Sequence, residues 1–238
     1  MPSSLAGQDQ RQRALLLVVI ALASILLWQT RLGSLLLYPF TILATWFHEI
    51  GHGIAAMLAG RGFERLLIFA DGSGVALSLR PTDGYGATDA LIAASGPLGP
   101  AIAGALLIVA SRSPNATRDA LAVLGAALIL STLIWVRSLT GWLVLPALGI
   151  AIVALALRGS EHWRSFVIQL LGVQAAIGAW RQFGYLFSPG GTIGGELHRS
   201  DTGAIADVLL LPYWFWGALI SAAILALLWC SFRLAFRR

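Results

Sequence analysis

The chain has 238 residues, of which 58% are hydrophobic and 11% charged, with a mean hydropathy of +0.80. A soluble domain carries about 25% charged residues, so this composition excludes a water-soluble globule and indicates an integral membrane protein. The net charge of +5 comes entirely from arginine, which is scattered at the ends of apolar runs and suits lipid headgroups better than nucleic acid. The lone Cys230 permits no disulfide within the chain.

The chain begins with a polar segment, residues 1–13, that ends in two arginines and precedes the uncharged run 14–30. This pattern is similar to a signal peptide, but no small-residue cleavage site follows it. We therefore expect a retained first membrane span. By the positive-inside tendency, its N-terminus would lie in the cytoplasm.

The second predicted span, about residues 35–60, carries His48, Glu49 and His52 in its middle, in the sequence HEIGH. Positions i and i+4 share one helix face, about 5–6 Å apart at Cβ, so both imidazoles can bind one zinc ion. Glu49 is placed to accept a proton from a water that the metal acidifies. Pro39 lies in the first turns, where the helix should start or kink. Because ionisable groups are costly inside a membrane, we interpret the motif as a metal site rather than a structural polar cluster.

Two short apolar stretches, 63–70 and 74–80, follow the metal motif and are joined by a Gly-rich connection. The second stretch alternates in the manner of a strand, so the pair predicts a β-hairpin. Neither stretch reaches the ~20 residues that a helical span requires. The hairpin either closes a surface loop or offers an edge to an extended peptide beside the metal, and the sequence does not choose between these roles.

The third predicted span, 90–111, contains the segment SGPLGP at 95–100. Its glycines and prolines predict a broken helix, which membranes tolerate where neighbouring helices or a cavity satisfy the freed backbone groups. Small residues also let helices approach closely, so we expect this segment to pack against the metal-binding helix.

The rest of the chain contains further apolar runs and one Gly-rich polar loop, at 188–206. The runs are 120–136, 138–157, the weaker 165–187, and 208–232. The sequence thus predicts an α-helical polytopic membrane protein with about six or seven transmembrane helices and a short β-hairpin after the metal-binding helix. We favour six, because both arginine-bearing ends then lie in the cytoplasm. No composition shift divides the chain, so 1–238 is predicted to be one domain.

Two histidines and a water leave one protein ligand missing from a catalytic zinc site. The candidate donors are Asp71, Asp83, Asp89, Glu196, His198, Asp201 and Asp207. Asp71 and Asp83 lie in turn-like sequences, and Asp89 is placed as the N-cap of the third span. Chemistry alone does not rank Asp201 against Asp207. Two histidines and a carboxylate also suit non-haem iron, although a glutamate between the histidines favours hydrolysis by zinc.

Several features together resemble the site-2 protease family of intramembrane zinc metalloproteases, most like its small bacterial peptidase-like branch. They are HEIGH in a membrane span, a following hairpin, GPLGP in the next span and a late aspartate. The Gly60-Arg61 step after the motif is also similar to that branch, as is the SDTGAIA segment at 200–206 with Pro212 and Trp216 behind it. Pro100 stands where better-known members carry an asparagine, and SDTG replaces their LDG signature.

The resemblance implies zinc bound by His48, His52 and Asp201, with Glu49 as the general base. It implies an endopeptidase of the cell membrane that cleaves a protein substrate in or near a membrane-spanning segment, with the lipid bilayer as its surroundings and no nucleic-acid partner. The alternative function is a non-catalytic membrane protein that keeps the fold as a binding or scaffold module. A di-iron hydroxylase would need more ligands than the chain's 4 histidines supply. The sequence does not indicate the oligomeric state.

Overall fold

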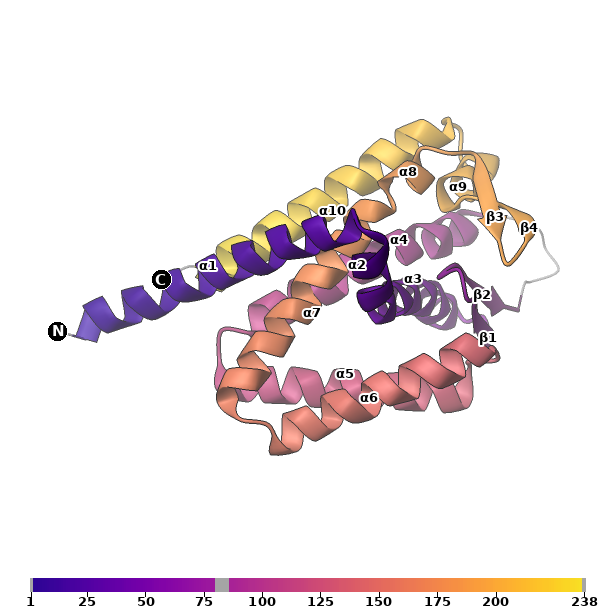
Figure 1. Cartoon of the computed structure of the whole chain (residues 1–238). Coiled ribbons are helices and arrows are strands. Elements are labelled where there is room, and N and C mark those ends of the chain that lie inside the picture. The colour runs from indigo at the N-terminus through magenta and orange to yellow at the C-terminus, as the bar shows by residue number, and fades with distance from the viewer. Residues whose placement is uncertain (1, 80–85, 237–238) are drawn as a thin grey trace.

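The computed structural model describes residues 2–79 and 86–236 and is mostly helical (Figure 1). Asp83, one of the candidate ligands, lies outside the described residues. The helices are α1 (Pro2–Trp28), α2 (Arg31–Leu36), α3 (Tyr38–Leu58), α4 (Ala87–Ala110), α5 (Pro114–Ile134), α6 (Leu139–Arg158), α7 (Glu161–Arg181), α8 (Phe183–Leu186), α9 (Asp201–Val208) and α10 (Tyr213–Phe236). The strands are β1 (Phe63–Ile68), β2 (Gly74–Ser78), β3 (Gly190–Ile193) and β4 (Glu196–Arg199).

Four helices in the described part of the chain, α4, α5, α6 and α10, are long and apolar enough to cross a membrane. The apolar part of α1, Leu15–Trp28, is shorter, while α3 and α7 are interrupted by ionisable and amide side chains. The fold class is therefore confirmed, whereas the expected six or seven spans remain a prediction. The free ends of α1 and α10 lie at the same end of the molecule, as an even number of spans requires (Figure 1).

The predicted span at 35–60 corresponds to α3 and begins later than expected, because its first two residues end the short helix α2. Thr30 caps α2, its Oγ1 accepting a hydrogen bond from Gly33 N at 2.9 Å, and α2 ends at Leu36. Helix α3 begins at Tyr38 with Pro39 in its first turn, where the missing N–H of proline would have no helical partner in any case. The sequence-based expectation for Pro39 is confirmed.

Helix α4 is continuous through Pro97 and Pro100, so the predicted break is wrong. The expected packing against α3 is confirmed: a Cβ at Gly51 would lie 2.7 Å from Ser95 O, and one at Gly99 would overlap Phe47 O. This close approach buries both prolines in the interior. The contact area gained there offsets the backbone hydrogen bonds that the prolines cannot donate.

The predicted hairpin at 63–80 is confirmed over its described residues, with β1 antiparallel to β2 and Ile68 opposite Gly74. The outer edge of β1 is covered, because Leu66 N donates to Trp135 O at 2.9 Å and Leu66 O accepts from Arg137 N at 3.0 Å. In the described structure β2 pairs with no strand other than β1, and on its other edge the Ala76 N–H is hydrogen-bonded to Glu49.

The predicted loop at 188–206 is largely ordered secondary structure, which corrects the sequence interpretation. Gly194 and Gly195 have φ of +59° and +90°, the left-handed conformation that a two-residue hairpin turn requires, and they join β3 to β4. Helix α9 follows directly. The last long helix, α10, then starts at Tyr213, later than predicted, because Pro212 and an extended segment separate it from α9.

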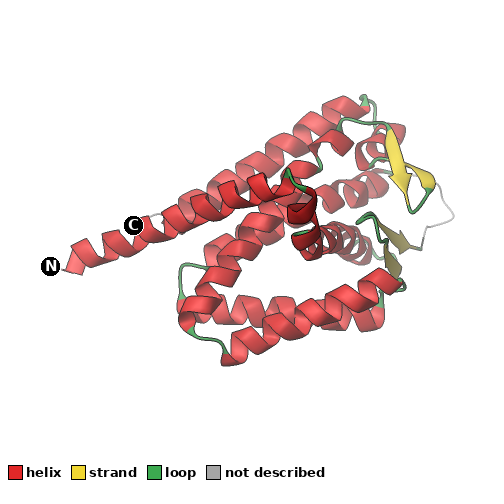
Figure 2. Cartoon of the chain, viewed as in Figure 1, coloured by secondary structure: helices red, strands yellow, loops and turns green. Residues whose placement is uncertain are grey.

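The two hairpins lie at the same end of the molecule and flank α3 (Figure 2). Their turns touch, since Gly194 N donates to Ser73 Oγ at 3.4 Å. The turn of the β1–β2 hairpin is also hydrogen-bonded to α3, because Thr45 Oγ1 donates to Gly72 O at 2.5 Å. A buried apolar cluster from α3, β1, α5, α6 and α7 holds the other side of α3, so the polar face of this helix points toward the hairpins and α9.

Candidate metal centre

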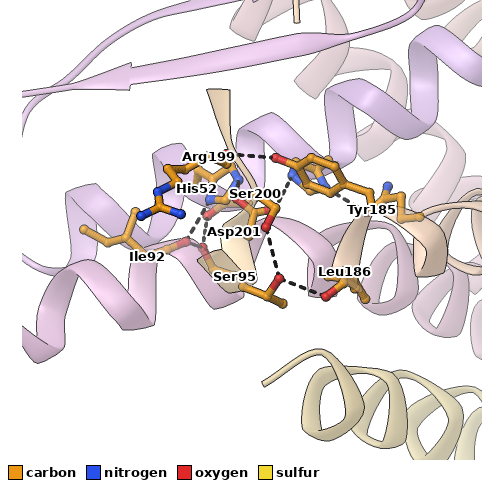
Figure 3. A network of polar contacts seen from close by, with 12 residues as sticks. His52, Ile92, Ser95, Tyr185, Leu186, Arg199, Ser200 and Asp201 are labelled. Atoms are coloured by element: carbon orange, nitrogen blue, oxygen red, sulfur yellow. Dashed lines mark hydrogen bonds and ion pairs between the residues drawn. The ribbon is translucent and has the colours of Figure 1, made fainter. Parts of the chain in front are cut away.

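The two histidines of HEIGH lie one helical turn apart on α3 and direct their Nε2 atoms to one carboxylate. His48 Nε2 is 3.1 Å from Asp201 Oδ2, and His52 Nε2 is 3.3 Å from Asp201 Oδ1. One ligand atom from each of the three residues lies within 4.8 Å of the others. Figure 3 shows Asp201 beside His52. The structure thus brings together residues that are about 150 positions apart in the chain.

Asp201 is the first residue of α9, and its neighbours hold this helix end in place. Ser200 Oγ accepts a hydrogen bond from Gly203 N at 3.0 Å, as an N-cap should, and donates to Ser188 O. Thr202 Oγ1 donates to Leu186 O at 2.8 Å (Figure 3). Ser200 and Thr202 are both fully buried. The SDTG sequence therefore fixes Asp201 through its two neighbours, which are themselves anchored to the end of α8.

The other ring nitrogen of each histidine is occupied by an acceptor. His52 Nδ1 lies 2.8 Å from the carbonyl oxygen of Ile92, which can only accept, so this nitrogen carries the proton (Figure 3). His48 Nδ1 lies 2.8 Å from Gln182 Oε1. In a neutral imidazole, a protonated Nδ1 leaves a lone pair on Nε2. Both Nε2 lone pairs therefore face Asp201.

This arrangement favours a positive charge between the three groups. When both imidazoles are neutral, two nitrogen lone pairs and a carboxylate are all acceptors, and they repel one another unless a metal ion or a proton on Nε2 separates them. Asp201 Oδ2 is buried and has no hydrogen-bond partner among the described residues. A Cβ added to Gly96 would overlap His52 Nε2 and lie 2.8 Å from His48 Nε2, so glycine leaves this position clear.

The three residues fit a zinc ion by donor type, and two of their three donor–donor separations also fit by distance. Zinc binds His nitrogen and carboxylate oxygen at about 2.0–2.2 Å, and tetrahedral ligands at that distance are about 3.4 Å apart. The contacts of 3.1 and 3.3 Å are close to this separation. Two histidines and one aspartate also leave one coordination position open, as catalytic zinc sites require.

Glu49 lies beside the same site, against β2. A Cβ added to Gly74 would lie 2.9 Å from Glu49 Cγ and 3.2 Å from Oε1, so Gly74 leaves room for this side chain. Glu49 is only 6% exposed. Its position next to His48 in sequence keeps it close to the ligands without making it one, since the three ligand atoms come from His48, His52 and Asp201.

All four residues line one cavity of about 880 Å³. Its walls are the polar face of α3, strand β2, the first turns of α4, the β3–β4 hairpin and α9. A volume of this size is within the usual range for ligand-binding clefts. The cavity is therefore large enough to admit a peptide segment and water to the cluster.

Residues 16–231 match the family model described as peptidase M50B-like. The chain belongs to this family. The matched region includes α3, both hairpins and α9, and it confirms the expected relationship to site-2 proteases. No curated protein and no solved structure matched in the same comparisons. The family identifies a membrane metallopeptidase-like protein, with the histidines of HEIGH and Asp201 close together in a possible metal site.

The other candidate ligands of this M50B-like protein are placed elsewhere. Asp71 binds Ser73, whose hydroxyl and backbone N–H hold the pKa of the Asp71 carboxyl below its usual range. Asp207 pairs with Arg199 at 2.8 Å. Glu196 and His198 are on β4, outside the described metal cluster.

Asp89 is the third helical residue of α4 rather than its N-cap, which corrects the sequence-based expectation. Its carboxylate accepts from Gly86 N at 2.8 Å and binds Arg61, so the N-terminus of α4 is tied to the turn after α3. The Gly60-Arg61 step thus has a structural role at the mouth of the cavity, which both Arg61 and Asp89 line.

Sequence reasoning missed two residues of the M50B-like site, Gln182 and Tyr185. Gln182 lies in the weak apolar run at 165–187 and orients His48. Tyr185 lines the cavity and donates to Arg199 O at 3.3 Å (Figure 3). The available signal was the polar character of an otherwise apolar span at 165–187, which marks side chains that must find a partner inside the protein.

Proposed function

We propose that this M50B-like protein is an intramembrane zinc endopeptidase of the cell membrane. Its substrate would be a membrane protein, cleaved in or near a membrane-spanning segment. The observation that carries the proposal is the convergence of His48 Nε2, His52 Nε2 and the Asp201 carboxylate beside Glu49 in one cavity. Three metal donors and a neighbouring carboxylate base are the parts that metal-assisted peptide hydrolysis requires.

His48, His52 and Asp201 would hold the zinc ion. When bound, zinc lowers the pKa of a water and polarises a carbonyl oxygen. Gln182 and the carbonyl of Ile92 keep both imidazoles turned with Nε2 toward Asp201. This positioning would lower the reorganisation needed for each ligand to bind the metal.

Glu49 would act as the general base. Its carboxylate is buried and lines the cavity, where it can accept a proton from water at the metal and later pass it to the leaving amine. Gly74 allows this side chain to lie against β2. The base is thereby held between the metal ligands and the edge of β2 that faces away from β1.

This edge of β2 would bind the substrate backbone. Ala76 is opposite Leu66, whose backbone groups point away from β2 toward Trp135 and Arg137, so Ala76 in turn directs its own N–H and C=O away from β1. Strand β2 lines the cavity that contains Glu49. A peptide added along this edge would be extended, as peptidases need, and its scissile bond would run past the base.

Glu49→Gln tests the proposed chemistry. The protein is reconstituted in vesicles with membrane-anchored candidate substrates, and cleavage and zinc content are measured on the same samples. Glutamine keeps the shape of the side chain but cannot accept the proton, so we expect zinc to be retained and cleavage to fall by about 10²–10⁴-fold. Asp207→Asn is the matched control, because it neutralises another carboxylate that lines the cavity. Equal cleavage by wild type and Glu49→Gln would exclude Glu49 as the base.

A further inference from the structure

An apolar groove lies between α1, α7 and α10 and has a volume of about 800 Å³. Aliphatic side chains of the first two helices form most of its floor, among them Leu17, Val18, Ala21, Ile25, Val173 and Ile177. Leu228 and Phe232 of α10 complete it. The metal ligands do not line this groove, so it is distinct from the cavity of the proposed function.

One end of the groove is polar and aromatic. Trp28, Gln29, Trp180 and Arg181 line it there, at the ends of α1 and α7. The guanidinium carbon of Arg181 lies 3.8 Å from the centroid of the Trp28 ring. Tryptophan and arginine at helix ends are typical of the headgroup level of a bilayer, where an amphipathic ring and a cation meet lipid phosphate.

Among the residues whose side chains the structure describes, 15–79 and 86–235, Arg181 has no anionic partner. The arginines in the ion pairs of these residues are Arg61 and Arg199, and the Arg181 side chain donates none of the hydrogen bonds among them. A guanidinium has five N–H donors in a fixed fork that matches phosphate oxygens. Stacking on Trp28 fixes the orientation of this group at the groove but satisfies none of its donors.

The length of the groove matches one leaflet. From Leu17 to Trp28, α1 rises about 16 Å over eleven residues at 1.5 Å per residue. Half the hydrocarbon thickness of a bilayer is about 15 Å. An acyl chain that starts beside Arg181 would therefore reach the bilayer midplane at the level of Leu17.

We propose that this groove binds an anionic phospholipid, with its phosphate on Arg181 and an acyl chain along α1 and α7. The unpaired guanidinium favours a net negative headgroup over a zwitterionic one, because a neighbouring ammonium would offset the attraction. The proposal does not depend on peptidase activity. The next residue, Gln182, contacts His48, so the lipid site and the metal centre are adjacent in the chain.

The test uses native mass spectrometry of the full chain in detergent, with phosphatidylglycerol and phosphatidylcholine of identical acyl chains added at equal concentration. Wild type should retain at least about tenfold more phosphatidylglycerol than phosphatidylcholine. This ratio is the size expected for hydrogen bonds to a charged group. Arg181→Gln should abolish the preference. Because Arg181 also borders the metal cavity, Ala21→Trp provides an independent variant that fills the groove and should reduce retention of phosphatidylglycerol as well.

Arg233→Gln is the matched control, since Arg233 also lies over a tryptophan, Trp229, at 5.0 Å but does not line the groove. It should keep the lipid preference, and Glu49→Gln should keep it whether or not the protein is a peptidase. Equal retention of the two lipids by wild type would overturn the proposal, as would an unchanged preference in Arg181→Gln. Competition by soluble glycerol phosphate at the same concentration as the lipid would also contradict it, because the acyl chain would then contribute nothing.

Discussion

Gln182 and the carbonyl group of Ile92 determine which ring nitrogen of each α3 histidine is directed toward a metal. Each provides an oxygen 2.8 Å from an Nδ1 atom, and this leaves both Nε2 atoms toward Asp201. Ile92 contributes a backbone oxygen, which no substitution removes. Gln182 contributes a side chain, so its role can be tested by mutation.

Gln182→Leu should weaken zinc binding by about 10–100-fold, the usual cost of losing a hydrogen-bond partner of a metal-bound histidine. The leucine leaves His48 free to rotate or to change its tautomer. Gln169→Leu is the matched control, because Gln169 is a buried glutamine of α7, the helix that Gln182 caps, and its side chain bonds only to Ser165 among the described contacts. Competition with a chelator of known zinc affinity measures both variants. Equal affinities for Gln182→Leu and wild type would show that Gln182 does not orient His48.

Helix α4 provides no metal ligand, but its glycines leave room for the imidazoles and the backbone of α3. Gly51, Gly96 and Gly99 let α3 and α4 approach until the backbone of one meets the backbone or imidazoles of the other. Ser95 Oγ strengthens this contact by donating to Gly51 O at 3.1 Å. The glycine–proline segment at 95–100 is therefore a packing surface for the metal helix.

Gly96→Ala should displace the imidazoles and reduce zinc content well below that of wild type, because the added methyl group would occupy the position next to both Nε2 atoms. Gly184→Ala should be neutral, since a Cβ there meets nothing within 4 Å. Circular dichroism should show both variants folded, and metal analysis separates them. Full zinc occupancy in folded Gly96→Ala would contradict this account of α4.

Ala76→Pro tests the edge of β2. The Ala76 N–H is hydrogen-bonded to the Glu49 carboxylate, and proline removes this donor both from the base and from a substrate backbone, so cleavage should fall strongly while zinc remains bound. Ala76→Ser keeps the N–H and should remain active. Zinc content and cleavage of a membrane-anchored substrate are measured together. A fully active Ala76→Pro would indicate that the hairpin only closes a loop.

The sequence predicted the features that depend on local spacing and missed those that depend on contacts between distant segments. His48, Glu49 and His52 follow from the helical repeat, and the hairpin after α3 follows from alternation and its glycines. The β3–β4 hairpin had a local signal as well, the pair Gly194-Gly195, but the surrounding polar residues were read as a loop. The partner of His48 in α7 could not be predicted, because nothing local in residues 165–187 specifies which of its polar side chains meets α3.

At the scale of the whole molecule, the metal centre joins two distant segments of the chain. His48 and His52 come from α3 in the buried interior, whereas Asp201 comes from α9 after the second hairpin. Without a metal, the carboxylate and the two lone pairs repel one another unless one Nε2 is protonated. A bound metal would therefore stabilise the packing of α9 and the β3–β4 hairpin against α3.

Removal of the metal should lower the thermal unfolding temperature. Binding to the folded state alone adds RT ln(1 + [L]/Kd), which is about 2.7 kcal/mol at a free metal concentration of 100 Kd. Differential scanning fluorimetry in detergent, with chelator and after readdition of zinc, measures the change. Asp201→Asn should already show the lower temperature and should respond little to chelator. An unfolding temperature that is the same with and without chelator would argue against a metal link between α3 and α9.

Zinc stoichiometry of the purified chain and its ligand variants tests the central claim most directly. Elemental analysis of protein prepared without chelator should find about one zinc per chain, because two imidazoles and a carboxylate directed at one point supply three of the four ligands of a zinc site. His48→Ala, His52→Ala and Asp201→Ala should each lose most of it, while Asp207→Ala and His198→Ala should keep it. Wild type without stoichiometric metal would contradict the metal centre, and loss of zinc in Asp207→Ala with retention in Asp201→Ala would contradict the assignment of its third ligand.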